Sequence, residues 1–420
     1  MKLKDKIAVI GLGYVGLPLA VGFAKKFKVI GYDIDSSRVI ELKKGFDRTQ
    51  EVTKKQLLDN NSIFFTNNYD DMIGSNFFII TVPTPITKNN KPDLSIIERA
   101  SATLAKVLAK GSIVILESTV YPGVTENFLV PILENNSGLK HKKDFFVAYS
   151  PERINPGETK YKLTNIKKVI GADCKNTLLK VSKIYKSIIK AGVHQVSSIK
   201  VAEASKAIEN AQRDINIAFV NEVMMLNKAL NIDSYEVLEA AKTKWNFLDF
   251  KPGLVGGHCI GVDPYYLAEA GRKVNFETKI ILAGREINDS LPKYLLYNLK
   301  NKLNKGAKVL LLGLSFKENV GDIRNSKSIE LAKLIKKNKF KLSCYDPKVN
   351  KRELLKECNI KINKPKGKYE CIILAVAHKE FIKMDISEIF NLMKNNSLII
   401  DIKGIWNKKL SSHYKNYWCL

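Results

Sequence analysis

Short apolar runs alternate with stretches of helical spacing over the first 150 residues of the chain. The apolar positions of 17–24 follow the period of a helix, and the runs typical of buried strands lie at 6–10, 28–33, 76–85, 112–119 and 145–149. This alternation predicts a doubly wound α/β sheet. Because ligands of such sheets bind at the carboxyl ends of the strands, we expect Thr84, Ser118 and Thr119 to face a cofactor crevice.

The pattern changes at Ile199, where helical spacing begins and continues to Leu226. A helix of this length, apolar on more than one side, typically joins domains or forms a dimer seam. Another helix is expected over about 275–303, and α/β alternation resumes at Lys308. We therefore predict an α/β protein of three parts. They are an N-terminal Rossmann dinucleotide-binding domain (1–198), a long central helix with a small helical domain (199–304) and a C-terminal Rossmann-like α/β domain (305–420).

A glycine-rich turn, Gly11-Leu-Gly13-Tyr-Val-Gly16, stands between the first predicted strand and its helix. The second strand ends at Asp33, whose carboxylate can accept hydrogen bonds from both ribose hydroxyls of a dinucleotide. No Arg follows Asp33 directly, which favours NAD over NADP. The alternative is a tight strand-to-helix turn that binds no ligand. The C-terminal α/β part lacks this fingerprint, so we expect it to bind something other than a second NAD.

The length of 420 residues and the hydrophobic fraction of 45% allow two or three buried cores. The sequence has no apolar run long enough to span a membrane and no apolar signal segment before the first strand, which predicts a cytoplasmic protein without membrane association. The six cysteines lack the spacing of a metal site, so we expect neither disulfides nor a bound metal.

The net charge of +27 raises the possibility of nucleic-acid binding. Only nine of the 69 basic residues are Arg, the lysines are spread over the chain, and no nucleic-acid-binding motif accompanies them. We therefore expect no nucleic-acid partner and attribute the charge to solvated surface. Part of it could steer an acidic substrate, for example one with a diphosphate.

Cys259 lies in a segment too broken by Gly and Pro to form a helix or a strand, between Gly257 and Gly261 and shortly before Asp263. Flanking glycines let a backbone approach a ligand closely and leave a thiol uncovered. The alternative for this residue is a small buried thiol in an irregular loop. Lys206 and Asn210 are four residues apart on the long helix and so share a face, which could equally be a solvated face.

Several motifs occur in a characteristic order over nearly the whole chain. They are Gly11–Pro18, Val82–Pro85, Glu117–Gly123, Ser150–Arg153, the Lys206/Asn210 helix, Gly256–Cys259 and Ser315–Ser326. Together they resemble the nucleotide-sugar 6-dehydrogenases of the UDP-glucose/GDP-mannose dehydrogenase family. The stretches 256–266, 150–157 and 244–247 look like the branch that acts on UDP-N-acetylhexosamines, in particular the UDP-N-acetylglucosamine 6-dehydrogenases of Vi-type capsule synthesis.

The resemblance implies an NAD-dependent enzyme that oxidises a sugar 6-hydroxyl twice, to a carboxylate, for surface polysaccharide precursors. An aldehyde has no hydride to give until its carbon is tetrahedral, so the second oxidation needs a nucleophile. By the resemblance Cys259 forms a thiohemiacetal and then a thioester that water hydrolyses. Lys206 and Asn210 would stabilise negative charge on the sugar oxygen. The resemblance also implies a homodimer, which the long central helix would form.

Three more residues are implied in the hydrolytic step. Asp263 and Thr119 are suited to hold and activate water, with Asp263 as the general base. Glu152 would lie beside the substrate and the hydrolytic water, and the sequence leaves open whether it acts as a base or only orients the water. We expect His258 to pack or to form hydrogen bonds rather than to catalyse.

The resemblance further implies the residues that bind the two ligands. Those for NAD are Gly11, Gly13, Tyr14, Val15, Gly16, Asp33, Arg38, Pro83, Thr84, Ser118, Thr119 and Arg324. Those for the nucleotide sugar are Glu152, Arg153, Lys206, Asn210, Lys251, Gly256, Gly257, Phe316, Lys317 and Lys403. Lys403 stands where many relatives have Arg, so a bidentate contact could become a point-charge contact.

Other functions remain open at this point. A two-electron dehydrogenase of the hydroxyacid type shares the glycine turn and a catalytic Lys/Asn helix but has no use for Cys259. A non-catalytic binding protein could keep the same fold. Within the family, UDP-N-acetylgalactosamine, UDP-N-acetylmannosamine and UDP-glucose are alternatives to UDP-N-acetylglucosamine.

Overall fold

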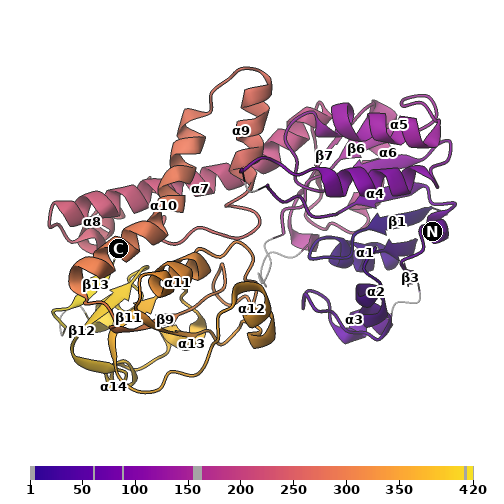
Figure 1. The fold of residues 1–420 in the computed structure, drawn as a ribbon. Helices are drawn as coiled ribbons and strands as arrows, with labels where there is room; N and C mark the ends of the chain where they lie inside the picture. The colour runs from indigo at the N-terminus through magenta and orange to yellow at the C-terminus, as the bar shows by residue number, and fades with distance from the viewer. Residues whose placement is uncertain (1–4, 60–61, 88, 155–162, 411–413, 420) are drawn as a thin grey trace. The chain divides into compact units, whose positions relative to one another are not determined.

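The computed structural model describes residues 5–59, 62–87, 89–154, 163–410 and 414–419. The chain forms two compact units, which are described separately below (Figure 1). The N-terminal unit comprises Met1–Glu209 with Tyr265–Phe276, and the C-terminal unit comprises Asn210–Pro264 with Glu277–Leu420. The last three residues of the 150–157 motif lie outside the described residues.

The N-terminal unit contains an eight-stranded sheet of order β3-β2-β1-β4-β5-β6-β7-β8. Its strands are β1 (Lys6–Ile10), β2 (Lys28–Tyr32), β3 (Ile63–Thr66), β4 (Phe77–Ile80), β5 (Ile113–Leu116), β6 (Phe146–Tyr149), β7 (Lys168–Ala172) and β8 (Val193–Gln195). Neighbouring strands are parallel except β6 and β7, which are antiparallel. Since β2 and β4 flank β1, the strand order reverses at β1, where doubly wound sheets bind their ligands.

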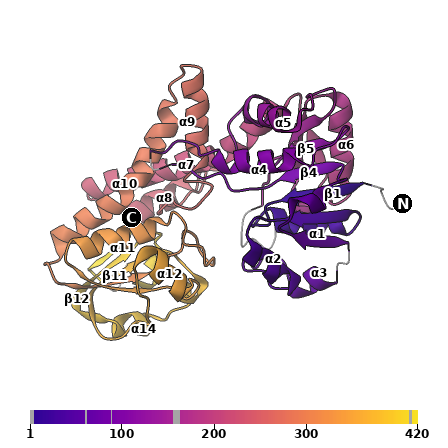
Figure 2. The ribbon, with the colours of Figure 1, turned by 45° about the vertical axis from the view of Figure 1, so that its right-hand side comes forward.

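Helices cover both faces of this sheet. They are α1 (Gly16–Ala24), α2 (Ser36–Lys43), α3 (Lys54–Leu58), α4 (Ser95–Ala105), α5 (Val130–Ser137) and α6 (Lys175–Lys186), with short helices η1 (Tyr69–Met72), η2 (Thr125–Leu129) and η3 (Leu163–Asn165). Alternate strand residues such as Ile7 and Val9 pack with α1 and α6, whose Phe23 and Tyr185 rings meet edge to face at 5.4 Å. Helix α4 lies on the opposite side from α1 (Figure 2).

The C-terminal unit contains a five-stranded parallel sheet of order β10-β9-β11-β12-β13. Its strands are β9 (Lys308–Leu312), β10 (Lys341–Tyr345), β11 (Tyr369–Leu374), β12 (Met393–Asp401) and β13 (Tyr417–Cys419). Its helices are α8 (Ser234–Ala241), α10 (Lys279–Lys302), α11 (Lys327–Lys337), α12 (Lys351–Cys358), α13 (Lys379–Ile382), α14 (Ile386–Asn391) and α15 (Asn407–Leu410). Helices α11 and α14 lie on opposite sides of the sheet (Figures 1 and 2).

Two helices, α7 (Ile199–Ala229) and α9 (Asp263–Lys273), lie where the sequence passes from one unit to the other. Helix α7 is continuous, and the division between the units falls inside it, between Glu209 and Asn210. Helix α9 follows the cysteine-containing loop. The C-terminal half of α7 belongs to the core of the C-terminal unit, where Met224 packs with Leu295 of α10 and Val309 of β9.

The observed fold confirms the predicted α/β class, with Rossmann-type sheets at both ends of the sequence and a long helix between them. The predicted N-terminal strands correspond to β1, β2, β4, β5 and β6, whereas β3, β7, β8 and β13 were not predicted. These four are short or lie at or near a sheet edge, where hydrophobic runs are weak. Within the described residues, no helix is long and apolar enough to cross a membrane.

Candidate active site

The glycine turn of the N-terminal unit connects β1 to α1 and is fixed by Asp33 at the end of β2. One carboxylate oxygen of Asp33 accepts the backbone N–H of Leu12 at 2.7 Å, and the other accepts that of Asp35 at 3.0 Å. A Cβ atom on Gly16 would lie 1.8 Å from the carbonyl oxygen of Gly11, so only glycine fits there. The turn therefore needs the glycines that the sequence pattern singled out.

The same turn has the features of a dinucleotide site. A Cβ atom on Gly13 would meet no protein atom within 4 Å, which leaves the backbone open to a ligand. Helix α1 begins after Val15 without a side-chain cap, so its first N–H groups can receive a pyrophosphate. The residues of the turn thus fit NAD, whose nicotinamide ring accepts hydride. Arg38 is buried beneath the turn, where it donates to the carbonyl oxygen of Leu12 at 2.9 Å and to Asp47 at 2.7 Å.

In the same unit, a hydrogen bond joins the segments that follow β4 and β5. The Ser118 hydroxyl donates to the carbonyl oxygen of Val82 at 2.7 Å, and Thr119 next to it is half-buried. Pro83 is exposed and Thr84 half-buried on the neighbouring segment. Tyr266 on α9 donates from its hydroxyl to the carbonyl oxygen of Pro85 at 3.2 Å.

Glu203 on α7 holds the segment that follows Thr119 in place by hydrogen bonds. Its carboxylate accepts the backbone N–H groups of Gly123 at 2.5 Å and Thr125 at 2.9 Å, as well as the Thr125 hydroxyl at 2.7 Å. Burial raises the pKa of Glu203, although these hydrogen bonds act in the opposite direction. Lys206 lies one helical turn further along α7 and is 9% exposed, so it does not lie on a solvated helix face.

Glu152 belongs to a buried ionic cluster with Glu117 and Lys168, at the ends of β5 and β6 and the start of β7. The Lys168 ammonium is 2.7 Å from Glu117 and 2.9 Å from Glu152. Glu117 also accepts the Tyr185 hydroxyl. The neighbouring Arg153 pairs with Glu209 of α7 at 2.6 Å and donates to the carbonyl oxygen of Lys167 at 3.2 Å.

Cys259 belongs to the C-terminal unit, in a turn that leads into α9. Its carbonyl oxygen accepts the backbone N–H groups of Val262 at 2.9 Å and Asp263 at 2.8 Å, and its side chain is half-buried. Asp263 is 1% exposed, and its carboxylate accepts a hydrogen bond from the side-chain amide of Asn210 at 2.5 Å. The C-terminal unit therefore brings Asn210, Asp263 and the backbone of Cys259 together.

The glycines before Cys259 pack against the 315–326 segment of the same unit. The N–H of Gly257 donates to the carbonyl oxygen of Asn325 at 3.3 Å, and a Cβ atom on Gly257 would lie 2.5 Å from the Phe316 ring. A Cβ atom on Gly256 would lie 2.3 Å from the carbonyl oxygen of Asn325. His258 meets the Phe316 ring edge to face at 5.4 Å. Close backbone approach therefore explains both glycines.

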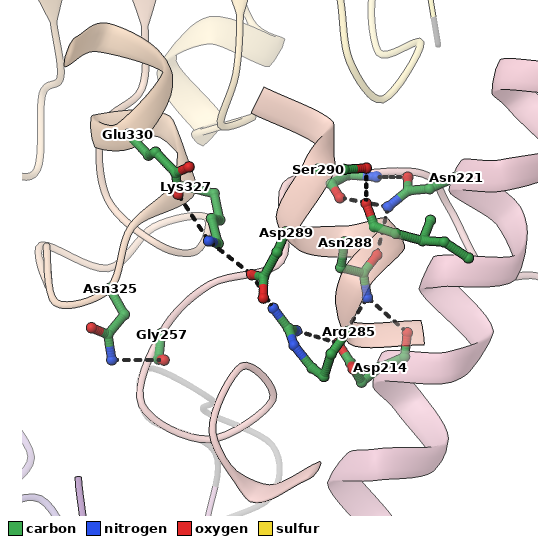
Figure 3. Close-up of polar contacts among 12 residues, drawn as sticks. Asp214, Asn221, Gly257, Arg285, Asn288, Asp289, Ser290, Asn325, Lys327 and Glu330 are labelled. Carbon is green, nitrogen blue, oxygen red and sulfur yellow. Dashed lines mark hydrogen bonds and ion pairs between the residues drawn. The ribbon is translucent and has the colours of Figure 1, made fainter. Parts of the chain in front are cut away.

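The start of the cysteine loop is held by a chain of buried side chains (Figure 3). Asn221 on α7 donates to the carbonyl oxygen of Gly253 at 3.1 Å and accepts its N–H at 2.9 Å. The same amide donates to Asn288 on α10 at 2.8 Å, and Asn288 donates to Asp214 on α7 at 2.8 Å. Arg285 pairs with Asp214 at 2.6 Å. These four residues, Asn221, Asn288, Asp214 and Arg285, are at most 2% exposed.

Four of the charged residues predicted to bind the substrate or NAD lie in loops of the C-terminal unit: Lys251, Lys317, Arg324 and Lys403. Lys403 pairs with Glu318, and its Cε atom would lie 3.2 Å from a Cβ on Gly253. Burial alone would raise the pKa of Glu318, but the Lys403 ammonium outweighs this effect and holds that pKa below its usual value. Arg324 is half-exposed and pairs with Asp322 at 2.5 Å, and Lys251 is exposed. Lys317 is half-buried.

Some residues of these sites had little or no signal in the sequence. Lys168 and Glu117 each stand at an end of an apolar run, where a charged residue ordinarily indicates solvent. Asn221 and Asn288 lie in long helices, separated by 67 residues. The motif context of Glu117–Gly123 was a clue to Glu117, but only the pairing in three dimensions identifies Lys168 and the two asparagines.

The sequence matches three domain models of one family. Residues 5–189 match the NAD binding domain of the UDP-glucose/GDP-mannose dehydrogenase family, residues 200–290 match its central domain, and residues 310–408 match its UDP binding domain. The chain belongs to the UDP-glucose/GDP-mannose dehydrogenase family. The resemblance inferred from the motifs and the expected cofactor NAD are thereby confirmed.

Members of this dehydrogenase family match the chain along its whole length. It is 47% identical to the UDP-N-acetyl-D-glucosamine 6-dehydrogenase of Pseudomonas aeruginosa, over 97% of this chain and 99% of that one. It is 48% identical to protein CapL of Staphylococcus aureus, over 100% of both chains. The solved structure of the UDP-D-ManNAc dehydrogenase from Pyrococcus horikoshii is similar with a TM-score of 0.87 and 32% identity, over 99% of this chain and 98% of that one.

Within this dehydrogenase, the family domains correspond to the geometry described above. The NAD-binding match contains the glycine turn with Asp33 and the cluster around Lys168. The central-domain match contains Lys206, Asn210 and Cys259. The UDP-binding match contains the 315–326 segment and Lys403.

Proposed function

We propose that the protein catalyses the NAD-dependent, four-electron oxidation of the 6-hydroxyl of a UDP-N-acetylhexosamine, UDP-N-acetylglucosamine, to the uronic acid. The observation that carries this proposal is the half-buried Cys259 thiol, one turn before an Asp263 carboxylate that is hydrogen-bonded to Asn210. A two-electron dehydrogenase needs no such cysteine. The relative of Pseudomonas aeruginosa named UDP-N-acetyl-D-glucosamine 6-dehydrogenase supports the choice of sugar.

Bound NAD supplies the hydride acceptor for each of the two oxidations. In the first, the sugar C6 hydroxyl gives its proton to water and C6 gives up hydride, which leaves the aldehyde. Lys206 and Asn210 stabilise the negative charge that develops on the sugar oxygen, by an ammonium and an amide N–H respectively. Both are buried, which strengthens their electrostatic effect.

The second oxidation runs through Cys259. Its thiolate bonds to the aldehyde carbon, and the resulting thiohemiacetal can give up hydride to form a thioester. The oxygen of water then bonds to the thioester carbon, the C–S bond breaks, and the sulfur leaves as the thiolate. Asp263 takes a proton from that water, while Thr119 and Glu152 orient it.

The nucleotide sugar is held by backbone and charged groups around the cysteine loop. Lys317 and the backbone of the 251–256 loop bind the UDP diphosphate, and Gly256, Gly257 and Phe316 shape the loop. Arg153 and Lys403 contact the sugar or phosphate, Lys403 as a point charge where a relative's Arg would bind bidentately. Arg324, with the glycine turn and residues Pro83, Thr84 and Ser118, contacts NAD.

The test is the number of NADH molecules formed per sugar consumed, measured by absorbance. Wild type and Cys259→Ala are each given UDP-N-acetylglucosamine, UDP-N-acetylgalactosamine, UDP-N-acetylmannosamine and UDP-glucose separately. We expect two NADH per UDP-N-acetylglucosamine for the wild type and no release of acid by Cys259→Ala. One NADH per sugar, unchanged in the variant, would refute the thioester mechanism and favour a two-electron dehydrogenase.

We also propose that two copies of the chain associate through α7 in the cytoplasm, where NAD and nucleotide sugars are available. Phe219 and Leu226, two helical turns apart on α7, are 59% and 55% exposed. Large apolar side chains on one helix face typically mark an interface. Phe219→Asp with Leu226→Asp should yield a monomer in light scattering, whereas Leu179→Asp, at the 55%-exposed Leu179 on α6, should leave the mass unchanged. A wild-type monomer would rule out this assembly.

A further inference from the structure

Lys168 is a lysine without access to solvent. It is the first residue of β7, its side chain is 3% exposed, and its ammonium forms two ion pairs, with Glu117 and with Glu152. Burying an ammonium is costly unless it is paired and hydrogen-bonded. The cluster therefore has a specific arrangement, with one cation shared by two buried carboxylates.

Both carboxylates are fixed at their second oxygen as well. Glu117 uses it to accept the Tyr185 hydroxyl. Glu152 uses it to accept the backbone N–H groups of Arg153 at 2.6 Å and Ile154 at 2.7 Å. Glu152 thus accepts hydrogen bonds from three donors, which leaves its carboxylate little freedom to rotate.

Lys168 supplies the positive charge that faces the two carboxylates of the cluster. Burial raises the pKa of Glu117, and the nearby ammonium opposes that rise. Burial would lower the pKa of Lys168, but the two carboxylates outweigh it and raise that pKa. Lys168 therefore stays protonated, and without its charge two carboxylates would face each other in a buried space.

We propose that Lys168 is a positioning residue for thioester hydrolysis: its ammonium, shared with Glu117, holds the Glu152 carboxylate in the orientation that directs it at the hydrolytic water. This inference rests on the proposed function, in which Glu152 orients the hydrolytic water. A carboxylate can accept a hydrogen bond from that water, whereas a protonated carboxyl group facing it can instead donate one. Lys168 does not touch the substrate and acts only through Glu152.

Substitutions of the two neighbours of Glu152 should have opposite effects on the pH dependence of hydrolysis. Lys168→Gln removes the cation, so the two carboxylates take up a proton more readily and the acid limb of the rate moves to higher pH, by about 1 to 2 units. Glu117→Gln leaves one cation for one carboxylate, so the acid limb moves to lower pH. The double variant, Glu117→Gln with Lys168→Gln, should lie between the two.

The experiment follows the thioester on Cys259 directly. Enzyme is mixed with UDP-N-acetylglucosamine and NAD, NADH is recorded by stopped flow, and quenched samples are analysed by mass spectrometry between pH 5.5 and 9. At neutral pH, Lys168→Gln should release two NADH per site in a fast phase and then accumulate the adduct on Cys259. Hydroxylamine, which cleaves thioesters, should remove the adduct.

A matched control separates positioning from general loss of stability. Asp173→Asn also alters a buried carboxylate of the N-terminal unit, outside the cluster, and should leave the acid limb at the wild-type pH. Acid limbs that coincide in wild type, Lys168→Gln and Glu117→Gln would overturn the inference. Should Lys168→Gln fail to fold, Glu117→Gln alone decides by its downward shift. A wild type that forms no NADH would instead refute the proposed function.

Discussion

Asn221 offers a direct test of how the cysteine loop is held. Replacing it by Ala removes both hydrogen bonds to the Gly253 backbone and the one to Asn288. Three buried groups lose their partner in the process: the N–H and the carbonyl oxygen of Gly253, and the side-chain oxygen of Asn288. None of these groups can reach bulk solvent without a movement of the loop, because Gly253 and Asn288 are buried.

Each buried group left without a partner costs about 1 to 3 kcal/mol. A water molecule in the vacated space would satisfy part of them, so we expect a loss of about 3 to 6 kcal/mol in the free energy of unfolding of the C-terminal unit. With a urea m-value of about 3 kcal/mol per molar, the midpoint should fall by about 1 to 2 M. Asn221→Asp should cost at least as much, because it places a carboxylate against two carbonyl oxygens.

Tryptophan fluorescence measures this effect selectively. The chain's three tryptophans, at 245, 406 and 418, all lie in the C-terminal unit, and Trp406 and Trp418 are buried. Asn216→Ala is the matched control, since that asparagine on the same helix donates only to the carbonyl oxygen of Gln212 in an exposed position. A midpoint for Asn221→Ala that equals that of Asn216→Ala would refute the reasoning.

Two more predictions concern the glycine turn and the pH dependence of stability. Gly16→Ala should lower the melting temperature of the N-terminal unit, because its Cβ atom would lie 1.8 Å from a carbonyl oxygen. Gly13→Ala has open space around it, so it should keep the melting temperature and weaken NAD binding. Equal melting temperatures for the two variants would contradict this prediction. Burial raises the pKa of Asp214 to about 6 against the opposing effect of Arg285. Between pH 4 and 6 the folded chain thus binds a proton that the unfolded chain does not, so its free energy of unfolding should fall as pH rises through this window, by up to about 3 kcal/mol. Denaturant titrations at these pH values should show the fall in wild type and not in Asp214→Asn.

Local patterns were enough to predict the elements that place the glycine turn. The turn between β1 and α1 and the carboxylate of Asp33 follow from a strand, a set of glycines and a helix in sequence order. The elements that hold the cysteine loop could not be predicted in this way. Asn221 and Asn288 pair only because α7 and α10 pack against each other, and nothing in either helix alone distinguishes these amides from solvated ones.

The ionic cluster was missed for a related reason. Lys168 begins one strand and Glu117 follows another, and the two residues are 51 positions apart in the sequence. The strand pairing that joins them includes the antiparallel pair β6/β7, which a reading of alternating strands and helices does not anticipate. The charges are buried because these strands pair, and the residues next to each charge in the sequence do not indicate this burial.

The division of the chain inside α7 also limits how such proteins can be recombined. A chimera joined before Ile199 keeps Lys206 and Asn210 from the same parent, whereas one joined at the division between Glu209 and Asn210 takes them from different parents. Helical geometry makes the junction between Glu209 and Asn210 intolerant of length changes, since a single residue inserted there would turn Asn210 by about 100° relative to Lys206. Loops elsewhere in the chain can absorb insertions, but the spacing between this cation and this amide is set by one uninterrupted helix.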